Sequence, residues 1–177
     1  MAVRPIRLLG DPVLRKRAKR VPQVDASIQR LIDDMIDTLR EASGVGLAAP
    51  QIGVSLRVIV IEVPDEEVIA LVNPEIVKRA GQRLLDEGCL SIPGYRAEVT
   101  RSLNVVVKGL DRQGRPVRIK AKDDLLAHAL EHEIDHINGV LYIDHLESLD
   151  ELIRIEPATG GEEEEVAAGP QAGGGGG

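Results

Sequence analysis

The sequence of 177 residues has few aromatic side chains: two tyrosines, and neither phenylalanine nor tryptophan. Its core must therefore be aliphatic, and nucleobases would find almost no rings to stack on. The one cysteine, Cys89, excludes a disulfide within the chain, as is usual in a reducing compartment. No apolar run approaches the roughly 18–20 residues that span a bilayer. The first residues also lack the apolar stretch of a secretory signal. These absences predict a cytoplasmic protein that does not enter the membrane.

The length fits one domain, and the formal net charge is −7. This charge disfavours a phosphate-backbone partner, so we expect no direct binding to nucleic acid. Residues 15–20 (RKRAKR) are basic, but so short a run is typical of a solvated face. The last residues, GGEEEEVAAGPQAGGGGG, are too polar and too glycine-rich to order themselves. We therefore predict a catalytic domain at residues 1–155 and a flexible acidic, glycine-rich tail at residues 156–177.

Hydrophobic periodicity gives the expected elements. Apolar residues from Ile28 to Leu39 recur at helical spacing, with Asp25 as the expected N-cap. A second helix is expected at residues 123–138, and the glycine-rich residues 44–53 are expected to form a loop. Strands are expected at residues 57–63, 69–72, 76–85, 104–110 and 116–121. Short connections favour antiparallel pairing. The prediction is an α+β fold: a mostly antiparallel sheet packed around the second helix, with an N-terminal helix.

The second helix carries the pattern HExxH at residues 132–136. His132 and His136 are four residues apart, so both imidazoles lie on one helix face and can bind a single metal ion. Glu133 is placed to act as a general base on water beside that ion. A catalytic site of this type needs a third protein ligand. The residues alone leave two sources open: the upstream Cys89, or one of the downstream His145, Glu147 and Glu151.

Two further segments complete a pattern. Residues 44–51 read GVGLAAPQ, in which small residues permit close backbone approach and Gln51 could donate a hydrogen bond to an oxyanion. Residues 87–91 read EGCLS around Cys89. These segments and the HExxH helix, in this order, resemble the three signature motifs of the peptide deformylase family, and the similarity covers roughly residues 4–149.

The resemblance implies that Cys89, His132 and His136 hold one divalent ion, usually ferrous iron, with zinc, nickel or cobalt also found. The implied reaction removes the formyl group from the formyl-methionine that begins new polypeptides and releases formate. Glu133 would move the proton, while the Gln51 side chain and the Leu90 backbone N–H would stabilise the oxyanion. Substrate would lie against Gly44, Val45 and Gly46, and the methionine pocket would include Leu125 and Ala129.

Some features depart from the family pattern or leave choices open. Glu131 stands where the family often has glutamine; its extra carboxylate either raises the basicity of nearby groups or faces solvent. His128 could line the rim of the pocket or be an exposed polar residue, and of these we expect exposure. Glu87, Asp135 and Asp144 are candidate carboxylate partners of the metal-binding histidines. Many bacterial members dock on the ribosome through a basic C-terminal helix, whereas the last residues of this sequence are glutamates and glycines, whose charge would repel RNA and argues against such docking.

Three rival functions make different predictions. An HExxH metalloprotease would use a downstream third ligand and would tolerate loss of Cys89. A thiol hydrolase would use Cys89 as its nucleophile and would survive chelators. A non-catalytic metal-binding protein would hold the ion without turnover.

Overall fold

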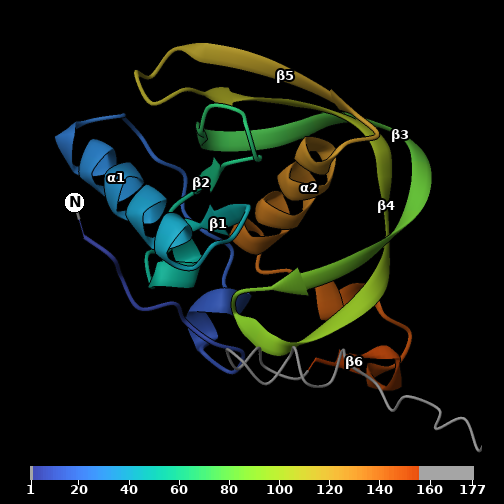
Figure 1. The fold of residues 1–177 in the computed structure, drawn as a ribbon. Helices are drawn as coiled ribbons and strands as arrows, with labels where there is room; N and C mark the ends of the chain where they lie inside the picture. Colours follow the sequence, from blue (N-terminus) through green and yellow to red (C-terminus); the bar gives the residue numbers. More distant parts are fainter. Residues whose placement is uncertain (1, 156–177) are drawn as a thin grey trace, which may run out of the picture.

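The computed structural model describes residues 2–155, which form a mostly antiparallel sheet and two α-helices (Figure 1). The strands are β1 (Gly46–Ala48), β2 (Val58–Ile61), β3 (Ile69–Cys89), β4 (Ile92–Leu110), β5 (Pro116–Lys122) and β6 (Ile153–Arg154). The helices are α1 (Ala26–Glu41) and α2 (Leu125–Ile137), and short 3₁₀ turns occur at Pro12–Arg15, Ala49–Ile52, Tyr142–His145 and Leu149–Glu151. The predicted α+β class and antiparallel sheet are confirmed. The predicted tail, residues 156–177, lies outside the described residues.

The sheet runs in the order β1-β2-β3-β4-β5, with every neighbouring pair antiparallel, and β6 pairs separately with β4. Strands β3 and β4 form one long hairpin. Its turn consists of Leu90 and Ser91, because Cys89 pairs with Ile92. Strand β1 is an end strand of the sheet. The cysteine motif therefore sits at the tip of a hairpin, and the glycine-rich segment lies at a sheet edge.

The strands differ from the sequence prediction in three places. The two strands expected at residues 69–72 and 76–85 are one strand, β3, whose register shifts after Val72 and after Ile76. These irregularities and the exposed polar residues between them hide the alternation that marks a continuous strand. Strand β4 begins at Ile92, twelve residues before the expected strand. The segment expected to be a loop, residues 44–53, contains β1 and a 3₁₀ turn. The sequence did not reveal this strand, because three residues are too few to show a period.

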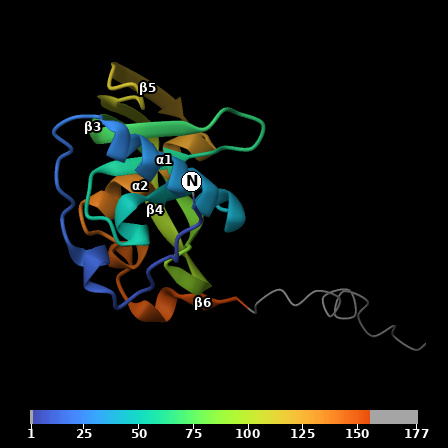
Figure 2. The same cartoon turned by 90° about the vertical axis from the view of Figure 1, so that its left-hand side faces the viewer.

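Helix α1 begins where predicted, since the Asp25 side chain accepts a hydrogen bond from the Ile28 N–H. Its apolar face packs against β1 and β2. Helix α2 begins after Asp124, whose side chain accepts from the Ala127 N–H. It lies between β1 and β2 on one side and the curved strands β3 to β5 on the other (Figure 1). Strands β5 and β6 lie at opposite ends of the molecule (Figure 2).

The buried side of α2 contributes Ala127, Leu130, Ile134 and Ile137 to an aliphatic cluster with Val105, Val107 and Ala121 of the sheet. This packing holds the motif-bearing helix rigidly against the hairpin that carries Cys89. Within residues 2–155, no helix is both long and apolar enough to cross a bilayer.

Candidate active site

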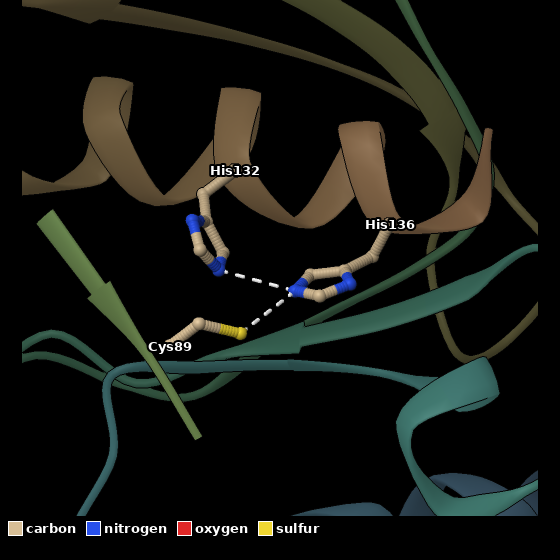
Figure 3. Close-up of side chains that lie close together, drawn as sticks. All are labelled: Cys89, His132 and His136. Atoms are coloured by element: carbon tan, nitrogen blue, oxygen red, sulfur yellow. Dashed lines mark hydrogen bonds between the residues drawn. The ribbon is translucent and has the colours of Figure 1, made fainter. Parts of the chain in front are cut away.

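The structure brings together Cys89, His132 and His136 (Figure 3). Their ligand atoms all lie within 4.8 Å of one another. The His136 Nε2 atom is 3.2 Å from Cys89 Sγ and 3.2 Å from His132 Nε2. The two histidines project from successive turns of α2, while the cysteine reaches them from the end of β3. The fold thus brings Cys89 close to His132, although the two residues are 43 positions apart in the sequence.

The donor set fits a shared cation. Ligand atoms at about 2.0–2.3 Å from a tetrahedrally coordinated ion lie roughly 3.3–3.6 Å apart. The two distances from His136 Nε2, each 3.2 Å, are close to that spacing. The His132 Nδ1 atom is hydrogen-bonded to the Glu87 carboxylate, which can only accept while it is ionised. His132 therefore carries a proton on Nδ1 and directs Nε2 at the cluster. A ring nitrogen that faces a sulfur and a second imidazole nitrogen is the arrangement that a divalent ion stabilises.

Glu87 is the buried carboxylate behind the histidines. Burial by itself would raise its pKa, but hydrogen bonds with His128, His132 and Arg101 hold that pKa well below its usual range. Arg101 donates a hydrogen bond to each Glu87 oxygen, from Nε at 2.9 Å and from Nη2 at 2.5 Å. The Arg101 side chain is 3% exposed and that of Glu87 is 1% exposed. Because this ion pair is buried and bidentate, it fixes the carboxylate that orients His132.

Beyond Arg101 the polar contacts continue to the surface. Asp135 accepts from Arg101 at 2.7 Å and lies 2.8 Å from His145 Nε2. His145 is therefore engaged with Asp135, and within residues 2–155 neither it, Glu147 nor Glu151 joins the cluster of ligand atoms. The structure thus does not supply the downstream third ligand that the metalloprotease alternative requires. Asp144, another candidate partner of the histidines, instead pairs with Arg15 at 2.5 Å.

Gln51 is buried, and the direction of its side-chain amide is fixed. Its Oε1 atom accepts from the Ala48 N–H at 2.9 Å. Its Nε2 group must then face the site, where it donates to Ser91 Oγ at 3.1 Å and lies 3.7 Å from Cys89 Sγ. Leu90 follows Cys89 in the hairpin turn and lines the same cavity. The two predicted oxyanion donors therefore both lie next to the cysteine.

Glu133 is 2% exposed, and its Oε1 atom has no hydrogen-bond partner among the described residues. Burial raises the pKa of Glu133 to about 7. A carboxyl group with such a pKa exchanges protons readily near neutral pH. Gly46 lies directly beside it, because a Cβ atom at Gly46 would fall 2.5 Å from Glu133 Oε2. The absent side chain at Gly46 thus makes room for the carboxylate.

A cavity of about 390 Å³ opens over these groups. The residues predicted to contact substrate all line it: Gly44, Val45, Gly46, Leu125 and Ala129. Tyr95 of β4 and Ile155, just after β6, also line it and were missed by sequence reasoning. Ile155 reaches the cavity because its N–H donates to the Gly94 carbonyl at 2.8 Å. No local motif in the sequence marks such a contact between distant segments.

Two expectations about α2 were wrong. His128 is not an exposed residue: its Nε2 atom lies 2.9 Å from Glu87 Oε2, and its side chain is 17% exposed. Glu131 neither faces solvent nor contacts the catalytic groups. It is buried, and it accepts hydrogen bonds from the Ser102 N–H at 2.6 Å and the Ser102 hydroxyl at 3.0 Å. This carboxylate ties α2 to β4 on the side away from the cavity.

Comparisons with known proteins agree on one family. The family model described as polypeptide deformylase matches residues 3–152. A peptide deformylase of Dehalococcoides mccartyi (strain CBDB1) is 59% identical over 158 residues, which are 89% of this chain and 94% of that relative. A crystal structure of a peptide deformylase from Legionella pneumophila has a TM-score of 0.81 at 52% identity, covering 85% of this chain and 89% of that one. A crystal structure of a peptide deformylase from Synechococcus elongatus in complex with actinonin has a TM-score of 0.79 at 44% identity, covering 82% of this chain and 80% of that one.

Proposed function

This chain belongs to the peptide deformylase family and removes the formyl group from new polypeptides, and we propose how its residues divide that work. The observation that supports the proposal best is the cluster of Cys89, His132 and His136 beside the buried Glu133. The resemblance to the family assigns the first three of these residues to the metal ion and Glu133 to proton transfer.

Cys89, His132 and His136 would hold one divalent ion, for which we propose Fe²⁺. A thiolate with two imidazoles also accepts Zn²⁺, Ni²⁺ and Co²⁺, so the choice of iron rests on the family resemblance. When bound, the ion supplies a Lewis acid, which polarises a carbonyl and makes water a better nucleophile near neutral pH. Glu87 and Arg101 keep His132 in the tautomer that binds the ion through Nε2.

Glu133 is the proton carrier. The residue lines the cavity, its Oε1 atom has no hydrogen-bond partner among the described residues, and its raised pKa lets it take a proton from the attacking water and pass it to the leaving amine. Glu87 does not share this role, because it is kept ionised and is engaged with its own partners. The proton thus moves from water to the amine through one side chain.

Negative charge on the former formyl oxygen would be stabilised by the Gln51 Nε2 group and the Leu90 backbone N–H. The hydrogen bond from Ala48 to Gln51 Oε1 prevents the amide from turning its carbonyl toward the oxyanion. The donor is therefore oriented before substrate arrives.

The peptide would extend along the cavity edge of β1. This strand ends the sheet, and Gly44, Val45 and Gly46 line the cavity. Their backbone groups can pair with an extended peptide as an added strand. Leu125, Ala129 and Val45 offer an apolar surface to the methionine side chain. We place the reaction in the cytoplasm, where new polypeptides are made.

Formate release from a short formyl-methionyl peptide by iron-loaded protein tests the activity. Glu133→Gln should lower kcat by about 10²–10⁴-fold and still bind one metal ion per chain, because Glu133 is not a ligand. Cys89→Ser should lose both metal and rate. Elemental analysis of the two variants beside the wild type measures metal content. A Cys89→Ser protein that keeps its metal and its activity would contradict the assignment.

A further inference from the structure

Five exposed cationic side chains share the outer face of the sheet formed by β3, β4 and β5. They are Lys78, Lys108, Arg118, Lys120 and Lys122, and we call their surface the basic face. Cross-strand pairing places Lys78, Val106 and Lys120 in one row, and Ala80, Asn104 and Lys122 in a neighbouring row. A third row consists of Glu75, Lys108 and Arg118, so one carboxylate also lies on this face. Residues far apart in the sequence thus form one continuous surface.

The alternation of the strands shows which way this surface faces. Val105, Val107 and Ala121 are buried against α2. Successive strand residues point to opposite faces, so the cations between them point away from α2 and from the catalytic cavity. A molecule bound there would leave the cavity open.

The charge of the basic face is largely uncompensated. Lys108 has one carboxylate within reach, Glu75, at 3.7 Å. Within residues 2–155, no carboxylate pairs with the other four cations. Elsewhere on the hairpin, by contrast, arginines are matched with acids: Arg79 with Glu131, Arg83 with Asp123, Arg96 with Asp86 and Arg101 with Glu87.

The shape of the basic face is a hollow between two cationic rims. Lys78 forms one rim, while Arg118, Lys120 and Lys122 form the other, with Asn104 and Val106 between them. The rims are separated by two strand spacings, about 9–10 Å, and the cations of β5 recur every ~6.7 Å. A regular row of charges of this length matches a polyanion better than it matches one small anion.

We propose that the basic face binds the phosphate backbone of RNA. The choice of RNA among polyanions rests on the proposed function, because new polypeptides are made on a particle rich in RNA. The absence of aromatic side chains among the residues that line the hollow makes this binding independent of sequence. This proposal revises our expectation, based on the net charge alone, that the protein does not bind nucleic acid directly. Binding at a surface depends on the local distribution of charge.

The test measures binding of the full chain to a fluorescent RNA duplex while the salt concentration is raised. About four phosphate contacts should give a log–log slope of roughly −3 to −4. Lys120→Glu combined with Lys122→Glu should weaken binding at least about tenfold and flatten the slope by about 2. Lys120→Gln with Lys122→Gln replaces this variant if the glutamates prevent folding. The matched control is Lys16→Glu with Arg20→Glu, which changes the charge equally at exposed positions outside the basic face and should change affinity less than about twofold.

Three results would overturn the proposal. Equal weakening in the two charge-reversed variants would mean that only net charge matters. Tighter binding to phosphatidylglycerol vesicles than to RNA would identify a membrane surface as the partner. If the substitutions at Lys120 and Lys122 did not change RNA binding, the basic face would not be the RNA-binding surface. The lysines of β5 would then serve only to prevent this edge strand from pairing with strands of other chains. Deformylation of a short peptide should be unchanged in all variants, so a failure of RNA binding is distinguishable from a failure of the proposed function.

Discussion

Adding one methyl group at Gly46 should disable the site without touching a metal ligand. A Cβ atom there would lie 2.5 Å from Glu133 Oε2, 2.9 Å from its Cγ and 3.0 Å from its Cδ. Ordinary contacts of a Cβ begin at 3.4 Å, so the carboxylate must move by about 1 Å. The Gly46 backbone itself does not have a positive φ angle, so alanine is strained only by this contact.

The magnitude follows from the displacement. A misplacement of about 1 Å in a reacting group costs about 10²-fold in rate, so kcat of Gly46→Ala should fall by about that factor. Overpacking of the buried glutamate should also lower the free energy of unfolding by about 1–3 kcal/mol. Metal content should stay at the wild-type level, because Cys89, His132 and His136 are not displaced. Formate release, urea unfolding and elemental analysis measure the three quantities.

Gly88→Ala is the matched control. Gly88 also lines the cavity, but a Cβ atom there would meet only the Tyr95 carbonyl oxygen, at 3.4 Å. This substitution should leave kcat within about threefold of wild type, since an ordinary contact displaces nothing. If Gly46→Ala retained full activity, the close packing of Glu133 against β1 would have no catalytic importance, and the argument from the missing side chain would be wrong.

Two further substitutions test the charges that support the site and the fold. Arg101→Met leaves the buried Glu87 carboxylate without its bidentate partner and should lower the free energy of unfolding by about 3–5 kcal/mol; a loss below about 1 kcal/mol in urea unfolding would contradict this. Burial would raise the pKa of Asp34, but hydrogen bonds from Arg4 and the Ala2 N–H hold it below its usual value. The folded pKa is thus the lower one, so ionised Asp34 stabilises the protein above about pH 4, and this contribution is lost as the pH falls through the folded pKa. Asp34→Asn should be less stable by about 1–2 kcal/mol near pH 7, and the difference should shrink toward pH 3, whereas a difference independent of pH would exclude the charge as its cause.

The helices could be predicted from the sequence because their signals are local. The apolar stripe of α1 and its Asp25 cap lie within one segment, and so do the two histidines of α2. The strands were harder to predict. The register shifts of β3 after Val72 and Ile76 interrupt its period, and β1 is too short to show one. Pairing with β2 makes Gly46–Ala48 a strand, and that partner cannot be read from three residues.

In the candidate site too, the local features could be predicted from the sequence and the contacts between distant residues could not. The pattern HExxH indicates two ligands and a base by its spacing, but the residues alone left the third ligand open between Cys89 and three downstream side chains. The roles of His128 and Glu131 were predicted wrongly, because each depends on a partner more than 25 residues away in the sequence: Glu87 for His128 and Ser102 for Glu131. Side chains of α2 that look polar and solvated in the sequence therefore contact the hairpin of β3 and β4.

The hairpin tip explains why one short segment supplies both a ligand and the carboxylate behind another ligand. Glu87 pairs with Ala97, whereas Cys89 pairs with Ile92, so the register shifts around Gly88. Such an irregularity re-aims side chains relative to a regular strand. It lets Glu87 turn toward His132 and Arg101 while Cys89 reaches His136. Because both side chains depend on the same backbone, any change that straightens the tip should disturb the thiolate and the tautomer of His132 together.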